Sequence, residues 1–254
     1  MKKKINIYVA AHKEAQFPDN SIYVSIEVGA YNKEKFLKVT DNTGDNISDK
    51  NSSFCELTAA YWILYNDNSD IVGLTHYRRY FFKKDTNKLE FVLDESDIKD
   101  ILKQYDMIVP NKNYLLKYKT VKDAYVSIHK EEDWDLCKEI IIEKYPDYEE
   151  AFEQLSNSRS FYTCNMFISS KKIFDDYYKW LFDILFELEK RVDISNYDDY
   201  NKRIFGFMSE RLFNVWIIKN NINIKEVPVY NTDKKMLPQQ IENKLKKVVL
   251  RLTR

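Results

Sequence analysis

Short apolar runs and longer amphipathic stretches alternate along the chain. Residues 5–11 are almost continuously apolar, which is typical of a buried strand. Shorter runs predict further strands, with Gly29 and Pro110 as stop signals, over 22–28, 71–75, 107–109, 166–169 and 222–229. Apolar residues at helical spacing predict helices over 57–65, 96–104, 131–144, 147–156, 171–191 and 208–219. Strands that alternate with helices in this way predict a layered α/β sheet.

The segment before the first expected helix carries a loop signal and a helix-start signal. Residues 41–51 are polar and contain glycine, which predicts a loop. Ser53 and Glu56 have the spacing of a capping box, which predicts that a helix begins just after them. No repeat or low-complexity linker interrupts the sequence up to residue 235, so we expect one domain over 1–235.

The C-terminal segment differs from the rest in its charge. Residues 244–254 contain five basic and no acidic residues, interleaved with leucines and valines. This pattern is typical of a basic amphipathic helix on an anionic membrane surface. A helix that packs on the domain through its apolar stripe, or a disordered end, would have the same pattern. We therefore separate 236–254 from the domain as a basic amphipathic tail.

Composition narrows the possible functions. The 254 residues suffice for one domain with a large core. Forty basic and forty acidic residues cancel, so no overall positive field would hold the chain on nucleic acid. Cys55, Cys137 and Cys164 have no metal-ligand spacing and predict reduced thiols. With no signal peptide and no stretch of the ~20 apolar residues that span a membrane, we expect a cytoplasmic protein.

A basic aromatic cluster follows the strand expected over 71–75. His76 is one of only three histidines, and Tyr77, Arg78 and Arg79 come directly after it. Guanidinium groups bind phosphate through two parallel hydrogen bonds and stack on aromatic rings. Clefts in open α/β sheets lie outside the carboxyl ends of the strands. The cluster therefore predicts the floor of an anion-binding cleft, although a solvated basic turn with inward tyrosines fits the pattern equally well.

The same cluster carries a family resemblance. The sequence V-G-L-T-H-Y-R-R-Y-F over 72–81 resembles the signature of a bacterial capsular and exopolysaccharide biosynthesis family. That family was first catalogued as a domain of unknown function and is now placed among glycosyltransferases. Other segments resemble further blocks of the family in the same order, at 7–13, 41–48, 56–62, 165–168 and 206–212. The resemblance implies a single-domain GT-A-like fold, a Rossmann-like α/β arrangement with a mixed sheet flanked by helices.

The resemblance also implies an activity. Some family members are β-galactofuranosyltransferases, so we expect transfer of a sugar such as galactofuranose from a UDP-sugar, with inversion. The expected acceptor is a capsular, exopolysaccharide or O-antigen intermediate, lipid-linked at the inner face of the cytoplasmic membrane, where 244–254 would make peripheral contact. The alternative is a non-catalytic glycan-binding or polysaccharide-assembly protein with the same fold.

The alternative gains support because the Asp-x-Asp motif that binds a metal in many GT-A enzymes is missing from the strand ends. Many GT-A enzymes hold Mn²⁺ or Mg²⁺ on the diphosphate with Asp-x-Asp after a strand. The match in this chain, Asp133-Trp-Asp135, lies in a stretch predicted to be helical, and we interpret it as a solvated helix start. Either positive groups neutralise the diphosphate directly, which we prefer, or carboxylates of the 41–45 loop hold a metal. The 41–45 loop also fits ordinary turn chemistry. The candidate donor-binding residues are His12, Lys13, Asp41, Asn42, Asp45, His76, Tyr77, Arg78 and Arg79.

An inverting transferase also needs a general base. The candidate is Glu210, in the family-like block 206–212, which we expect to lie where a late helix begins. An ion pair of Glu210 with a neighbouring arginine is the structural alternative. Asp198 and Asp199, in the preceding loop, are the reserve candidates for the base. His129 and Arg211 are the candidate acceptor-binding residues, although a lone histidine is more often structural.

Overall fold

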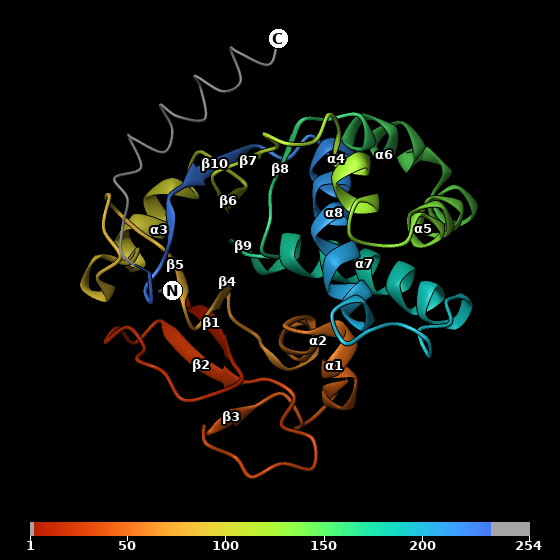
Figure 1. The fold of residues 1–254 in the computed structure, drawn as a ribbon. Coiled ribbons are helices and arrows are strands. Elements are labelled where there is room, and N and C mark those ends of the chain that lie inside the picture. Colours follow the sequence, from red (N-terminus) through yellow and green to blue (C-terminus); the bar gives the residue numbers. More distant parts are fainter. Residues whose placement is uncertain (1–2, 235–254) are drawn as a thin grey trace.

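A mixed sheet forms the centre of the molecule (Figure 1). The computed structural model describes residues 3–234. In spatial order the main strands are β10 (Ile224–Val227), β6 (Met107–Pro110), β9 (Phe167–Ser170), β4 (Ile71–His76), β1 (Ile5–Ala11), β2 (Tyr23–Glu27) and β3 (Val39–Thr40). From β4 to β3 the strands are parallel, whereas β9 runs antiparallel to both of its neighbours. The predicted α/β class with a mixed sheet is confirmed.

Two short strands extend the sheet beyond β4. β5 (Arg79–Phe81) pairs antiparallel with β4 through a single pair, His76 opposite Arg79, and with β11 (Val229–Asn231). The chain therefore reverses at Tyr77 and Arg78, directly after the end of β4. A separate two-stranded sheet joins β7 (Asn113–Tyr114) and β8 (Ser160–Phe161).

Helices enclose the sheet unequally. On one side α7 (Lys171–Arg191) packs on β4 and β9, and α8 (Ile204–Lys219) packs on α7. The same side carries α1 (Asn51–Phe54), α2 (Leu57–Asn66), α4 (Val121–Val126), α5 (Glu131–Lys144) and α6 (Glu149–Ser156) (Figure 1). The opposite face is covered by α3 (Glu95–Ile101). Because both faces are covered, the central strands are buried along most of their length rather than at alternate positions.

Gly73 lies where three strands of the sheet come close together. A Cβ atom at this position would lie 2.6 Å from Cγ1 of Ile168 on β9 and 3.0 Å from Cδ1 of Ile7 on β1. Both distances are shorter than a van der Waals contact. The glycine of the V-G-L-T-H stretch is therefore explained by packing inside the sheet.

The start of α2 differs from the predicted capping box. Ser53 lies inside α1 and its Oγ donates to the carbonyl of Lys50, while Glu56 makes no capping hydrogen bond. The prediction is wrong because the chain forms a separate short helix over 51–54 and then turns at Cys55. The expected 41–51 loop is correspondingly shorter. α8 begins at Ile204 rather than at 208, so Glu210 lies within the helix and not at its start.

The predicted tail over 236–254, including the possible membrane contact over 244–254, lies outside the described residues. The domain boundary at 235 therefore stays a prediction. Among residues 3–234, no helix is long and apolar enough to cross a membrane.

Candidate functional site

A cleft of about 430 Å³ opens at the carboxyl ends of β1, β2 and β4. Parallel strands that end at one edge of a sheet leave a crevice there, and this is the usual place for a ligand in an open α/β fold. The cleft is lined by Ala10, His12, Val28, Asn51, Ser52, Cys55, Glu56, His76, Tyr77, Arg78, Arg79 and Arg203. Five of the predicted donor-binding residues thus lie together, namely His12 and the four residues 76–79.

Arginines give the cleft a positive charge. Arg78 stacks its guanidinium over the ring of Tyr77, 4.8 Å from the ring centre, which fixes the direction of the charge. The Nε of Arg203 donates to the sulfur of Cys55 at 3.1 Å. Burial raises the pKa of Cys55 to about 11, so this thiol stays neutral and does not neutralise the arginine. Within residues 3–234, the one ion-pair partner of Arg78 is the exposed carboxylate of Asp233, at 3.7 Å.

The pKa of His12 is shifted by the same positive charges. Burial lowers its pKa, and the positive charges of Arg78, Lys13, Lys33 and Arg203 lower it further. Cations therefore converge on this side chain from several segments of the chain. A bound anion would relieve their mutual repulsion, as a diphosphate does when it meets preorganised positive groups.

His76 and Glu56 lie close together in the wall of the cleft. The Nε2 of His76 is 4.0 Å from Oε1 of Glu56, and the two side chains are 15% and 16% exposed. Burial lowers the pKa of His76, and the charge of Glu56 opposes that effect. Within the described part of the chain, Nε2 of His76 is buried and has no hydrogen-bond partner. Buried polar atoms are seldom left unpaired, so this nitrogen lacks the partner that its burial calls for.

Left-handed backbone surrounds Glu56. The φ angles of Cys55, Cys164 and Asn165 are 55°, 79° and 46°, although none of these residues is glycine. Such conformations cost about 1–3 kcal/mol each and persist only where the surrounding contacts fix them. They are concentrated at functional sites in proteins, and three of them lie around this carboxylate.

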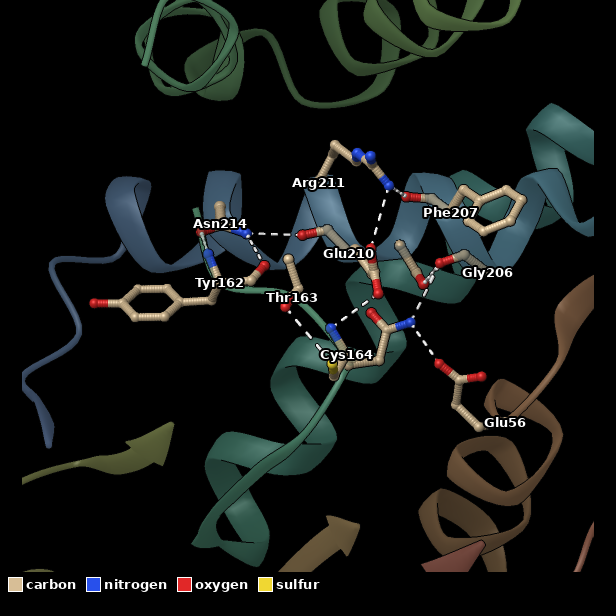
Figure 2. A network of polar contacts seen from close by, with 11 residues as sticks. Glu56, Tyr162, Thr163, Cys164, Gly206, Phe207, Glu210, Arg211 and Asn214 are labelled. Carbon is tan, nitrogen blue, oxygen red and sulfur yellow. Dashed lines mark hydrogen bonds and ion pairs between the residues drawn. The ribbon is translucent and has the colours of Figure 1, made fainter. Parts of the chain in front are cut away.

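Helix α8 fixes the strained segment over 162–165 (Figure 2). The side chain of Asn214 accepts from the backbone N–H of Tyr162 at 2.8 Å and donates to its carbonyl at 2.9 Å. One turn earlier, Oε1 of Glu210 accepts from the backbone N–H of Cys164 at 2.8 Å. Residues four positions apart lie on the same face of a helix, so this face presents a row of partners to the segment.

Asn165 joins this row to the cleft. Its Nδ2 donates to the carbonyl of Gly206, a further turn back on α8, at 3.2 Å, and to Oε1 of Glu56 at 2.9 Å (Figure 2). A Cβ atom on Gly206 would lie 3.2 Å from the sulfur of Cys55, so the helix approaches the Cys55 turn closely. The position of Glu56 is therefore set from both sides.

Glu210 does not line the cleft. Its Oε1 is occupied by the N–H of Cys164, and its Oε2 lies 3.3 Å from an arginine nitrogen of Arg211. Burial raises the pKa of Glu210, while the charge of Arg211 opposes the rise. The observed contacts are those of the ion-pair alternative, and the catalytic role of Glu210 stays a prediction.

The structure does not bring the 41–45 loop into the cleft. Asp41 is fully buried and its carboxylate accepts from the backbone of Gly29 and Ala30 and from the hydroxyls of Ser48 and Thr58. These donors need an acceptor because they are buried, so the carboxylate has no free position for a nucleoside.

The other two residues of that loop are also placed elsewhere. Asn42 accepts from the hydroxyl of Thr40 and donates to the carbonyl of Ala30. Asp45 is exposed on the surface. The ordinary turn chemistry of this segment accounts for the side chain of Asn42. Lys13 lines a neighbouring hollow that shares Tyr77 with the cleft.

The reserve acids lie outside the cleft as well. Asp198 accepts from the backbone and side-chain nitrogens of Asn201, at the turn η4 (Asn201–Arg203). Asp199 is fully exposed, with Lys202 at 3.7 Å. Neither side chain is among those that line the cleft.

The two predicted acceptor residues form a separate aromatic cluster. His129 binds the side-chain oxygen of Asn201 at 2.8 Å and stacks on the ring of Tyr200. The guanidinium of Arg211 lies 5.3 Å from the ring centre of Tyr125. Burial lowers the pKa of His129, and the charge of Arg211 lowers it further. Neither His129 nor Arg211 is among the residues that line the cleft.

The Asp-x-Asp sequence has a structural role. Asp133 lies in the first turn of α5 and accepts from the hydroxyl of Tyr197 at 2.6 Å, and Asp135 pairs with Lys122 at 3.0 Å. The interpretation as a helix start is confirmed, except that Asp133 is buried rather than solvated. Over residues 3–234, no group of three or more histidine, cysteine or acidic side chains is arranged to hold a metal ion.

Residues 6–221 match a family described as a domain of unknown function, DUF4422. The chain belongs to the DUF4422 family. Among solved structures it is similar to the apo structure of WbbM, a bifunctional glycosyltransferase, with 30% sequence identity and a TM-score of 0.84. The likeness covers 92% of this chain and 46% of WbbM, so the chain spans about half of that protein. This likeness confirms the predicted GT-A-like fold. No curated protein matches the sequence.

Glu56, Cys55 and Arg203 are among the lining residues of this DUF4422 chain that were not predicted from sequence. A signal for Glu56 did exist. The family-like blocks over 56–62, 165–168 and 206–212 begin with Glu56, Asn165 and Gly206, which are the three residues that one amide group connects.

Proposed function

We propose that this chain is a glycosyltransferase that binds a UDP-sugar with its diphosphate in the cationic cleft. The observation that carries the proposal is the convergence of Arg78, Arg79 and Arg203 around His12 at the carboxyl ends of the parallel strands. Positive groups aimed at a leaving diphosphate stabilise the charge that develops when the glycosidic bond breaks. The likeness to a bifunctional glycosyltransferase over nearly the whole chain supports the same reaction.

The arginines supply the charge that a divalent ion supplies in many GT-A enzymes. This part of the proposal rests on the residues at the end of β4, where His76, Tyr77 and Arg78 stand in place of paired carboxylates. Guanidinium groups are suited to the role because they bind phosphate oxygens in pairs and cannot lose their charge near neutral pH.

The finer parts of the proposal rest on the sequence signature over 72–81. We propose galactofuranose as the donated sugar, inversion at its anomeric carbon, and a lipid-linked surface-polysaccharide intermediate as the acceptor. The basic apolar sequence over 244–254 supports peripheral contact with the inner face of the cytoplasmic membrane.

The test is a panel of UDP-sugars incubated with the chain and a synthetic glycan acceptor. UDP release and glycan extension are measured together, and UDP binding is measured separately by calorimetry. The proposal expects UDP to bind and one donor to be consumed only when the acceptor is present. A chain that binds the oligosaccharide but has no affinity for UDP would instead be the glycan-binding protein.

A further inference from the structure

We infer that Glu56 is the general base that takes the proton from the acceptor hydroxyl, an inference that rests on the proposed transferase function. Among the described residues that line the cleft, Glu56 provides the one carboxylate. It therefore faces the same space as the arginines that would hold the diphosphate.

The contacts of Glu56 leave one oxygen available. Oε1 accepts from Nδ2 of Asn165 at 2.9 Å, whereas Oε2 accepts no hydrogen bond from residues 3–234 (Figure 2). The side chain is only 16% exposed, so the free oxygen is held in a fixed direction and is largely screened from bulk water. A base needs this combination of a free lone pair and a restrained position.

His76 marks where the hydroxyl would lie. Its unpartnered Nε2 is 4.0 Å from Oε1 of Glu56, which is too long for a hydrogen bond between them. We place the acceptor hydroxyl beside this pair, so that its oxygen binds to both side chains. The pair can thus fix the attacking oxygen while Glu56 receives the proton.

The chemistry balances without a further reactant. The acceptor oxygen forms a bond to the anomeric carbon while its proton moves to the Glu56 carboxylate. The bond from the anomeric carbon to the β-phosphate oxygen breaks, and its electron pair leaves with UDP. The arginines of the cleft neutralise the charge that appears on that oxygen. Glu56 afterwards returns its proton to solvent.

Glu210, the acid predicted from sequence, is less suited to this step. Both of its oxygens have protein partners, and it lies behind the strained segment that it holds. The two acids are joined through the segment over 164–165, because Glu210 binds Cys164 and Glu56 binds Asn165. We assign Glu210 as a positioning residue for Glu56.

The deciding experiment compares Glu56→Gln with the wild type and with Glu150→Gln, a control at an exposed glutamate of α6. Each protein is tested for thermal melting, for UDP affinity by calorimetry, and for single-turnover transfer from the UDP-sugar that the wild type uses. We expect Glu56→Gln to melt and bind UDP like the wild type but to transfer about 10²–10⁴-fold more slowly. Its residual rate should not change with pH over the range in which the wild-type rate rises.

Three results would overturn the assignment. Wild-type turnover in Glu56→Gln excludes the base role, and parallel losses of UDP affinity and turnover make Glu56 a donor-binding group instead. If Glu56→Gln does not fold, Glu56→Asp keeps the charge but withdraws the carboxylate, and unchanged turnover in that variant excludes the role. Failure of the wild type to bind UDP at all is a separate outcome, since it refutes the proposed function.

Discussion

Single arginines of the cleft are expected to determine donor affinity. We predict that Arg78→Ala and Arg79→Ala each weaken UDP binding, because each removes a charge-assisted contact to phosphate. Such a contact contributes about 1.5–3 kcal/mol, which corresponds to roughly ten- to a hundredfold in affinity. Calorimetric titration measures the change, and Arg159→Ala, at an exposed arginine that does not line the cleft, is the control. Unchanged affinity in both cleft variants would favour a purely structural aromatic turn.

We expect the ionisation of Glu210 to affect how the stability of the protein depends on pH. Because burial raises its folded-state pKa, the stability that its protonated form provides is complete below the unfolded-state pKa of about 4.3. That contribution is lost as the pH rises through the folded-state pKa. Glu210→Gln cannot ionise, so we predict that its stability improves relative to the wild type as the pH increases. Urea unfolding from about pH 4 to about pH 8 measures the difference.

Parallel stability curves for the two proteins would show that Glu210 is not perturbed as described. The same variant also separates the two acids in function. We expect Glu210→Gln to retain much of its turnover, since the amide oxygen can still accept from the N–H of Cys164. A loss as large as that expected for Glu56→Gln would return the base role to Glu210.

The segment over 162–165 owes its shape to α8 more than to its own sequence. We predict that Asn214→Ala lowers the free energy of unfolding by about 1–3 kcal/mol, because it leaves the backbone of Tyr162 without partners. Turnover should fall more than UDP affinity, since the loosened segment positions Glu56 rather than the arginines. Asn220→Ala is the control, because Asn220 lies at the exposed end of the same helix. Equal effects in both variants would contradict the conclusion that Asn214 of α8 holds the segment over 162–165 in place.

Periodicity predicted the regular elements well and their connections poorly. The helix over 171–191 and the strand over 5–11 have the predicted bounds because each carries a strong apolar pattern along its whole length. The short α1 helix has no such pattern, and nothing in the sequence indicates that Cys55 adopts a positive φ. Because of these two features, Glu56 lines the cleft instead of forming the expected capping box.

The candidate site could be predicted where one strand end supplies it, and less well where distant segments meet. His76, Tyr77, Arg78 and Arg79 follow one another, so sequence alone placed them together. Asp41 looked equally suitable, but whether a carboxylate binds a ligand or its own backbone depends on folding. Arg203 reaches the cleft from a turn far along the chain, which no local pattern could show.

At the scale of the whole molecule, the net charge of zero does not show that the cleft is locally positive. The chain is neutral overall, yet cations from four segments converge on the edge where the parallel strands end. We predict that UDP affinity falls as salt is raised, because screening shortens the range of these charges from about 10 Å at 0.1 M to about 3 Å at 1 M. Calorimetry over that range measures the slope. Salt-independent binding would show that the cations do not contact the phosphates.

A structure of the chain with bound UDP, prepared with EDTA, tests the central claim most directly. We predict that the diphosphate lies in the cleft in contact with Arg78, Arg79 or Arg203, and that the free oxygen of Glu56 faces the same space. UDP found only beside the 41–45 loop or in the hollow around Lys13 would contradict this assignment. So would a cleft that stays empty at a UDP concentration of about 1 mM, which even a weak site with a binding free energy near −4 kcal/mol would half fill.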